Sequence, residues 1–288
     1  MNTYPQCLVD ELAKYGEQPT FDLDWDRAVL HMLRNRQTQL ADSFLELSPI
    51  IAQCQQECER ERQRFPDLSD PTVFEAHGQL LLHIANNIVL APQRRPFVVD
   101  DDNSLAIRFL LYYFNQCPLA ESVFPDRHYK LHKNILLQGG VGVGKTMLMQ
   151  VFSEYLRLTK NPMFFYNLSV TQMVNHFSMH NNIDLYTYNE DGCTGFRINP
   201  MHLCLNDIGV DNRPFYGIDT LTVVNDFLHA RNELWTNAAI TDRKFAHLTT
   251  NLTNDQLREK FSSRDAFNRI IDRFKTYNII PITGESRR

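Results

Sequence analysis

Residues 134–146 read NILLQGGVGVGKT, and this stretch decides the fold. The apolar run at 134–138 has the length and composition of a buried strand, and a glycine-rich turn follows it at once. The turn and the two residues after it fit G-x-x-x-x-G-K-[ST], a loop whose backbone N–H groups converge on a phosphate. Four of the 11 glycines of the chain lie within six positions here, so coincidence is a poor explanation. The stretch predicts a strand, a phosphate-binding loop and a helix, in that order.

The residue types of this loop suit the phosphates of a nucleotide. Its glycines let the backbone curl around the β-phosphate, and the start of the following helix adds its dipole. Lys145 is placed to neutralise charge on the β- and γ-phosphates, and the Thr146 hydroxyl is placed to bind Mg²⁺. A glycine-rich turn without a ligand is the alternative, and the flanking strand and helix make it much the weaker one. We therefore expect a nucleotide to contact eight consecutive residues, Gly139, Gly140, Val141, Gly142, Val143, Gly144, Lys145 and Thr146.

Strands and helices alternate along the second part of the chain. Beyond 134–138, the pattern predicts further strands at 163–168, 201–205, 245–250 and 277–282, and helices at 103–114, 146–158 and 220–235. Strands that alternate with helices form a parallel sheet that is covered on both faces. The sequence therefore predicts an α/β fold with a five-stranded parallel sheet.

The first part of the chain lacks strand patterns and is helical by its periodicity. Apolar and polar residues alternate with helical spacing at 25–36, 50–65 and 74–89. Pro92 and Pro96 then flank two arginines, which is typical of a linker. We therefore expect a mainly helical domain at 1–95 and a second domain at 96–288; the first becomes a partner-binding domain only through the family resemblance given below.

The composition indicates an ordinary globular protein. Of 288 residues, 43% are hydrophobic and 22% are charged, and no run of about 18 apolar residues predicts a membrane span. The six cysteines make no disulfide framework, so we expect a cytoplasmic protein with reduced thiols and no membrane partner. The net charge is −5, with 15 acidic and 9 basic residues in 1–100 but 7 acidic and 11 basic residues in 230–288. This distribution argues against a protein that coats nucleic acid with its whole surface. It permits a local basic face, and an ordinary solvated surface is the alternative.

Polar motifs accompany the later strands. Residues 206–209 read NDIG after an apolar strand, and FAHLTTN at 245–251 ends in an asparagine. RIIDRF at 269–274 places two arginines four residues apart, on one face of a helix. The N-K-x-D motif by which GTPases read guanine is absent, which disfavours GTP.

In this order and spacing, the motifs resemble those of AAA+ ATPases of the DnaC/IstB type, which are helicase loaders and transposition helpers. The resemblance spans about 100–288 and rests on the phosphate loop, NDIG at 206–209, TTNL at 249–252, RIIDRF at 269–274 and TGESRR at 283–288. It implies a five-stranded AAA+ core, binding of ATP with Mg²⁺, and self-association through the ATP site on single-stranded DNA. Only 15 residues follow Arg273, so we expect the helical lid of many AAA+ proteins to be reduced or absent.

The resemblance also implies catalytic roles outside the loop. Asn251 takes the place of the sensor-1 residue, which orients a water near the γ-phosphate. Arg273 takes the place of the arginine finger, which reaches the ATP of a neighbouring subunit and stabilises charge on the phosphoryl oxygens. Arg269 would support that helix or contact the nucleotide. A solvated helix face is the alternative for both arginines.

Asn206 and Asp207 depart from the family pattern, which has an Asp on the Mg²⁺ side followed by a second acid. Two alignments stay open. Either Asn206 faces the metal and Asp207 activates water, or Asp207 serves the metal and no second acid follows. With Thr146, these residues are the expected Mg²⁺ ligands. One carboxylate is missing in either alignment, so we expect intact ATP binding with slow hydrolysis.

A long insert at 171–199 is where the resemblance implies contacts to single-stranded DNA. The insert holds aromatic residues and one basic residue, which are Phe177, Tyr186, Tyr188, Phe196 and Arg197. Aromatic rings stack on bases and arginines bind phosphates, although ordinary packing explains any single ring equally well.

Two i,i+4 pairs have the spacing of metal ligands without the rest of a metal site. Cys54 and Cys58 lack a second pair of ligands nearby, and His176 and His180 lack the intervening Glu of a metalloprotease. We expect reduced thiols and ordinary insert residues.

These expectations combine into a two-domain AAA+ ATPase that loads or regulates a replicative DNA helicase on single-stranded DNA. A transposition helper that acts with a transposase is the alternative within the same chemistry. An ATP-dependent scaffold with little hydrolysis is a second alternative, and a small-molecule kinase is a third. The sequence leaves open the partner of 1–95 and the number of subunits.

Overall fold

The structure, a computed structural model, describes residues 4–188, 200–209, 219–238, 243–262 and 272–287. The chain forms two compact units, Met1–Arg64 and Phe65–Arg288. Among the described residues, no helix is both long enough and apolar enough to cross a membrane.

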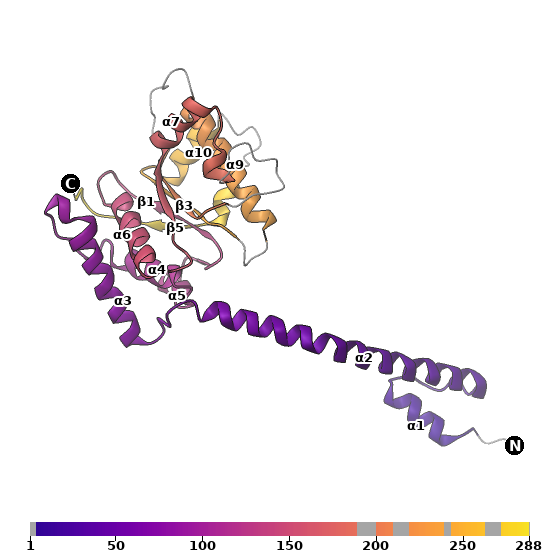
Figure 1. Cartoon of the computed structure of the whole chain (residues 1–288). Helices are drawn as coiled ribbons and strands as arrows, with labels where there is room; N and C mark the ends of the chain where they lie inside the picture. The colour runs from indigo at the N-terminus through magenta and orange to yellow at the C-terminus, as the bar shows by residue number, and fades with distance from the viewer. Residues whose placement is uncertain (1–3, 189–199, 210–218, 239–242, 263–271, 288) are drawn as a thin grey trace. The chain divides into compact units, whose positions relative to one another are not determined.

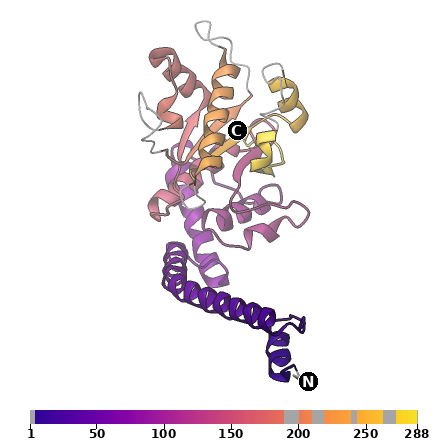
Figure 2. The same ribbon diagram turned by 90° about the vertical axis from the view of Figure 1, so that its right-hand side faces the viewer.

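The first unit consists of two helices, α1 (Gln6–Lys14) and α2 (Leu23–Arg62). Leu8 and Leu12 of α1 pack with Leu30 of α2 in a small apolar core. Figure 1 and Figure 2 show α2 as one continuous helix, with α1 beside its first turns.

The sequence pattern predicted two helices where α2 is a single one. The segments 25–36 and 50–65 fall in the same helix, because no glycine interrupts 37–49 and the helix continues through Pro49. A proline inside a helix removes one backbone hydrogen bond without always ending the helix.

A parallel sheet of five strands forms the centre of the second unit. The strands are β1 (Asn134–Gln138), β2 (Tyr166–Ser169), β3 (Leu203–Ile208), β4 (Ala246–Thr250) and β5 (Tyr277–Pro281). Their order is β2-β3-β4-β1-β5, and every neighbouring pair is parallel. The predicted α/β fold with a five-stranded parallel sheet and a helical N-terminal region is confirmed. The second and third strands begin two or three residues later than the apolar pattern suggested.

Helices cover both faces of this sheet. Ile135 and Leu137 of β1 join the apolar core on one face, and Leu136 joins the core on the other face. Figure 1 shows α4 (Ser104–Phe114) and α6 (Lys145–Leu158) on one side of the strands and other long helices on the other. Those on the other face are α7 (Val170–His180), α9 (Thr220–Asn237) and α10 (Asn254–Ser262). The short helices α5 (Ala120–Val123) and α8 (Asp184–Thr187) complete the unit.

A further helix, α3 (Pro71–Ile84), belongs to the second unit, although the sequence analysis placed the domain boundary after residue 95. Leu81 and Ile84 of α3 are buried in the same core as α6. The imidazole of His77 also lies 2.7 Å from the hydroxyl of Tyr155 on α6. The apolar face of α3 therefore packs this helix into the second unit.

The segment between α3 and α4 is irregular. A π-helical turn (Ala85–Val89) and a 3₁₀ turn (Ala91–Gln93) follow α3, and Arg94 then takes a left-handed conformation. After β5, the described residues 282–287 contain no helix.

Candidate nucleotide-binding site

The glycine-rich loop connects β1 to α6 at the carboxyl end of the sheet. Gly142 and Gly144 have φ of +86° and +100°, a region that side chains with a Cβ rarely adopt. Gly139 is required for a different reason, because a Cβ there would lie 2.1 Å from the carbonyl oxygen of Ile282. The loop therefore has the curled backbone that the sequence motif predicts.

Lys145 joins the loop to the end of β4. Its side chain is buried, and its Nζ donates hydrogen bonds to the carbonyls of Gly139 (2.8 Å) and Gly140 (2.6 Å). The same nitrogen donates to Oδ1 of Asn251 at 2.6 Å. The structure thus brings Lys145 and Asn251 together across 106 residues of sequence, because the carboxyl ends of parallel strands meet at one edge of the sheet.

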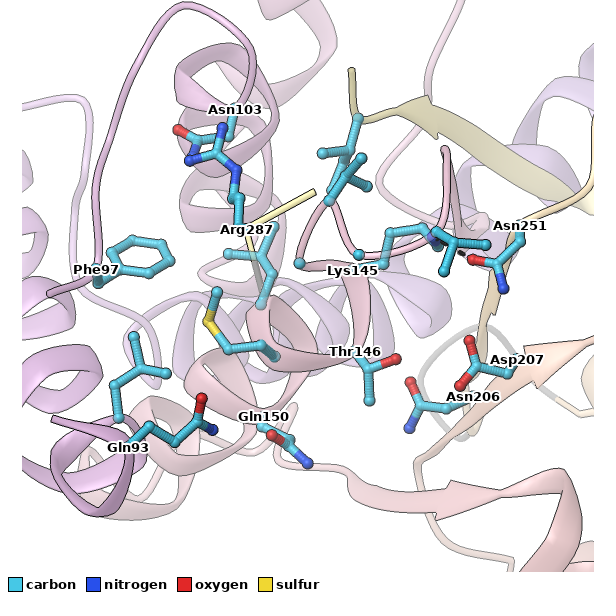
Figure 3. Close-up of a pocket in the computed structure, with 18 of the residues that line it drawn as sticks. Gln93, Phe97, Asn103, Lys145, Thr146, Gln150, Asn206, Asp207, Asn251 and Arg287 are labelled. Atoms are coloured by element: carbon cyan, nitrogen blue, oxygen red, sulfur yellow. Dashed lines mark hydrogen bonds between the residues drawn. The ribbon is translucent and has the colours of Figure 1, made fainter. Parts of the chain in front are cut away.

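A cavity of about 740 Å³ opens beside the loop. Figure 3 shows Thr146, Asp207 and Asn251 at one end of this cavity and Phe97 with Gln93 at the other. The first end is polar. At the second end Leu90, Pro96, Phe97 and Val98 supply apolar surface beside the polar side chains of Gln93 and Arg95, and we call it the apolar end. A cavity with one polar end and one mainly apolar end, within the usual range of about 300–1,000 Å³ for ligand sites, suits a nucleotide.

Asp207 stands in an unusual conformation at the end of β3. Its φ is +63°, and the register between β3 and β4 shifts between Leu205 and Ile208. Its backbone N–H donates to the Thr249 hydroxyl at 2.9 Å. Figure 3 shows the Asp207 carboxylate facing the same part of the cavity as the Thr146 hydroxyl. The irregular backbone therefore turns the carboxylate towards the phosphate end.

Asn206 is engaged within the sheet instead. Its side chain is buried and donates to Oδ1 of Asn167 and to the carbonyl of Leu168, both at 3.3 Å. Its Oδ1 accepts from the Thr249 hydroxyl at 3.3 Å. Although Asn206 also lines the cavity, both ends of its amide are committed to neighbouring strands. Of the two alignments left open by the sequence, this geometry favours the one in which Asp207 serves the metal.

The residues present fit a Mg²⁺ ion held with a nucleotide. Mg²⁺ prefers hard oxygen ligands, and in such sites it keeps phosphate and water ligands beside one or two protein oxygens. The Thr146 hydroxyl and the Asp207 carboxylate face the same part of the cavity, next to the phosphate loop.

Arg273 lies at the opposite end of the sheet from the loop. It immediately precedes a 3₁₀ turn (Phe274–Thr276), and it lines a small second cavity with Asn134 and Tyr277, the first residues of β1 and β5. The structure therefore does not bring Arg273 to the nucleotide cavity of its own chain. Arg269 lies outside the described residues.

The insert residues that were candidates for DNA contact serve mainly in packing where they are described. Phe177 and Tyr186 pack against the core under α7 and α9. The rings of His176 and His180 stack at 4.3 Å, and Tyr186 meets His176 edge-on at 5.0 Å. Tyr188 caps α8. Phe196 and Arg197 fall outside the described residues.

The cysteine pair on α2 resembles no metal site. Cys54 and Cys58 are exposed thiols, and the described part of the chain holds no cluster of three or more residues able to bind a metal. His176 and His180 likewise lie in no such cluster.

Sequence reasoning missed the apolar end of the cavity. Leu90, Pro96 and Phe97 come from a segment that looked like a linker, and Arg287 comes from the far end of the chain. The signal that pointed to Arg287 was the TGESRR motif at 283–288, to which no role was assigned.

Comparisons with known proteins give structural neighbours only. No model of a known protein family matches the chain, and no curated protein matches its sequence. A DnaC helicase loader, the class that the sequence motifs resemble, aligns with 65% of this chain and 93% of its own, at 16% identity and a TM-score of 0.41. A putative primosome component from Streptococcus pyogenes serotype M3 aligns with 67% of this chain and 85% of its own, at 17% identity and a TM-score of 0.43. AMPPCP-bound DnaA from Aquifex aeolicus aligns with 65% of this chain and 48% of its own, at 18% identity and a TM-score of 0.40. Such identities and TM-scores are too low to transfer a function from any of these proteins.

Proposed function

We propose that the chain is an ATP-binding AAA+ protein that loads or regulates a replicative DNA helicase on single-stranded DNA. One observation carries the nucleotide part of this proposal. Lys145 of the glycine-rich loop meets Asn251 at the end of β4, in a cavity that Thr146 and Asp207 also line. The loop N–H groups and Lys145 bind the triphosphate, and the apolar end around Phe97 receives the base.

The residues at the phosphate end have separate roles in hydrolysis. Asn251 orients the attacking water, and its contact with Lys145 holds both side chains in place. Thr146 and Asp207 would hold Mg²⁺, which neutralises charge on the β- and γ-phosphates. With Asn206 committed to the sheet, Asp207 is the one carboxylate that β3 directs to the cavity among the described residues. Slow hydrolysis follows from the lack of a second acid.

Arg273 acts on the ATP of a neighbouring subunit. Its position at the amino end of the sheet separates it from its own cavity, so a catalytic role requires a second copy of the chain. Self-association through the ATP site supplies that copy. A positive charge delivered in this way stabilises the transition state of phosphoryl transfer.

The first unit binds the partner protein. Large apolar side chains stand exposed at the start of α2 and just before it, with Phe21 at 71%, Trp25 at 59% and Met32 at 59%. Trp25 and Met32 are seven residues apart, which places them on one face of the helix. The assignment of this partner as a replicative helicase rests on the motifs that the second unit shares with loader ATPases. A transposase is the alternative partner.

Two measurements test this proposal. Equilibrium titration with Mg²⁺ and ATP is expected to show saturable binding that Lys145→Met weakens at least 100-fold, and the exposed Lys275→Met serves as the matched control. Light scattering of the full chain with the replicative helicase, with and without ATP, is expected to show a stoichiometric complex that Trp25→Ser with Met32→Ser abolishes. Absence of ATP binding overturns the nucleotide site. Absence of a complex in either condition moves the partner to a transposase.

A further inference from the structure

Residues 282–287 follow β5 and run along the glycine-rich loop; we call this segment the strap. At its start, the backbone N–H of Ile282 donates to the carbonyl of Gln138 at 2.7 Å. At its end, the N–H of Arg287 donates to the carbonyl of Gly142 at 2.9 Å. The strap is therefore hydrogen-bonded to the end of β1, where the phosphate loop begins, and to the middle of the loop.

The strap also lies so close to the phosphate loop that two loop positions, Gly139 and Gly142, have no room for a side chain. A Cβ on Gly139 would lie 2.1 Å from the carbonyl oxygen of Ile282, and a Cβ on Gly142 would lie 2.2 Å from Oγ of Ser286. Two glycines of the phosphate motif thus face the strap. The loop keeps its shape through contacts with the strap as well as through its own backbone conformation.

The strap is also bonded to the loop at 95–103. Nη2 of Arg287 lies 2.8 Å from both carboxylate oxygens of Asp100, and the Thr283 hydroxyl donates to Oδ1 of Asp102 at 2.8 Å. The guanidinium of Arg95 donates to the carbonyl of Arg287. The hydrogen bond from Arg287 holds the pKa of Asp100 below its usual value, so the pair is ionised at neutral pH.

These two sets of contacts join opposite walls of the nucleotide cavity. The 95–103 loop supplies Pro96, Phe97 and Val98 to the apolar end, and the glycine-rich loop forms the phosphate end. Arg287 lines the cavity between them, and Figure 3 shows its guanidinium beside Asn103. If the strap were only a continuation of β5, the hydrogen bond at Ile282 would be sufficient. The contacts to the 95–103 loop would then have no purpose.

We propose that Arg287 is a nucleotide-positioning residue that acts within its own chain. Through Asp100 it holds the 95–103 loop against the phosphate loop, and so it slows the release of bound nucleotide. The strap thereby supplies a cavity wall in a core where no lid helix follows β5 among the described residues. This inference rests on the proposed nucleotide function of the cavity.

Stopped-flow release of fluorescently labelled ATP tests the inference. The full chain is loaded with labelled ATP and Mg²⁺ and then mixed with excess ATP. Arg287→Ala and Asp100→Asn are each expected to accelerate release about tenfold, which corresponds to about 1.4 kcal/mol, in the range of a charge-assisted hydrogen bond. The double variant is expected to release no faster than the faster single one, because the two side chains act as a unit. Arg287→Lys keeps the charge and is expected to recover part of the wild-type rate.

Two controls separate positioning from general damage. Asp101→Asn removes an exposed carboxylate next to Asp100 and is expected to leave the release rate within twofold of wild type. The unfolding midpoint of the nucleotide-free chain is expected to fall only slightly in Arg287→Ala, because a partly exposed ion pair contributes little to stability.

Several results would overturn the inference. An unchanged release rate in Arg287→Ala, additive effects in the double variant, or faster release that matches a fall in the unfolding midpoint each contradicts a positioning role. In all three cases wild-type binding of ATP remains, and so does the proposed function. A wild-type chain that retains no labelled ATP overturns both proposals.

Discussion

The two ends of the parallel sheet both carry buried or half-buried polar residues but use them differently. At the amino end, polar side chains bond to backbone. His202 accepts a hydrogen bond from the N–H of Phe245, and His247 accepts one from the N–H of Ile135. Arg231 donates to four carbonyls, those of Thr187, Met201, Lys244 and Phe245. At the carboxyl end, Lys145, Asp207 and Asn251 line a large cavity.

The difference separates structural from functional polar residues. Hydrogen bonds stabilise a buried polar group, and at the amino end most of them come from the backbone, although Nε of Arg231 and Nε2 of His247 are buried without a partner among the described residues. Asp207 at the carboxyl end has instead a positive φ, a conformation that persists only where the surroundings impose it. Burial and charge alone do not distinguish a functional site from structural polar residues. The carboxyl end is distinguished by polar side chains that line one cavity, next to a backbone of irregular conformation at Asp207.

Arg231→Met, at the amino end, is expected to cause the largest loss of stability. The substitution leaves four backbone carbonyls without their buried cationic donor, and we expect the free energy of unfolding to fall by about 4 kcal/mol. Lys145→Met is the matched variant at the other end, where water in the cavity solvates the released carbonyls, and we expect a loss below about 1 kcal/mol. Chemical denaturation of both variants measures these losses. Equal losses would contradict the distinction between the two ends.

Asn206→Asp tests a residue that lies at the carboxyl end but bonds like those at the amino end. An aspartate there would face two acceptor oxygens, those of Asn167 and Leu168, so we expect a loss of about 2 kcal/mol. We also expect no gain in ATP hydrolysis, since the metal-facing carboxylate is that of Asp207. Denaturation and a phosphate-release assay measure the two effects. Faster hydrolysis with unchanged stability would restore Asn206 as the metal-side residue.

Counted per histidine and per pH unit, the pH dependence of stability is the smallest of these effects, and it belongs to the amino end. Burial lowers the pKa of His202 to about 3 and that of His247 well below the ordinary value, and the nearby cation Arg231 adds to both shifts. Unfolded histidines titrate near 6.5, so below about that pH the unfolded chain binds more protons than the folded chain. Stability is then lost as the pH falls, by about 1.4 kcal/mol per pH unit for each histidine.

Asparagine substitutions check this slope. In His202→Asn and His247→Asn, Oδ1 can replace Nδ1 as the acceptor, and each variant is expected to flatten the pH dependence between pH 6 and pH 4.5. Denaturant midpoints across that interval give the slope. A slope as steep in the double variant as in wild type would place the acid sensitivity elsewhere.

The site residues that were predicted from the sequence share one property, which is that each follows a parallel strand. Lys145, Asp207 and Asn251 could be expected together since parallel topology fixes which strand ends meet. Phe97 and Arg287 could not, because they come from irregular segments on either side of the sheet elements and reach the cavity by tertiary contacts alone. The role of Asn206 could not be predicted either. Aligning the motif made it a candidate metal ligand, but its amide bonds to residues on the two neighbouring strands, which the sequence does not reveal.

The central claim is that the two ends of the sheet meet between subunits, with Arg273 of one chain completing the cavity of the next. Mixing two inactive variants tests it most directly. Lys145→Met removes the phosphate contact and Arg273→Ala removes the finger, so we expect each alone to lack ATP hydrolysis in the presence of single-stranded DNA. In an equal mixture, about a quarter of randomly formed interfaces pair an intact Lys145 with an intact Arg273, so we expect up to about a quarter of the wild-type rate. Full activity of Arg273→Ala by itself, or no recovery in the mixture, would contradict the claim.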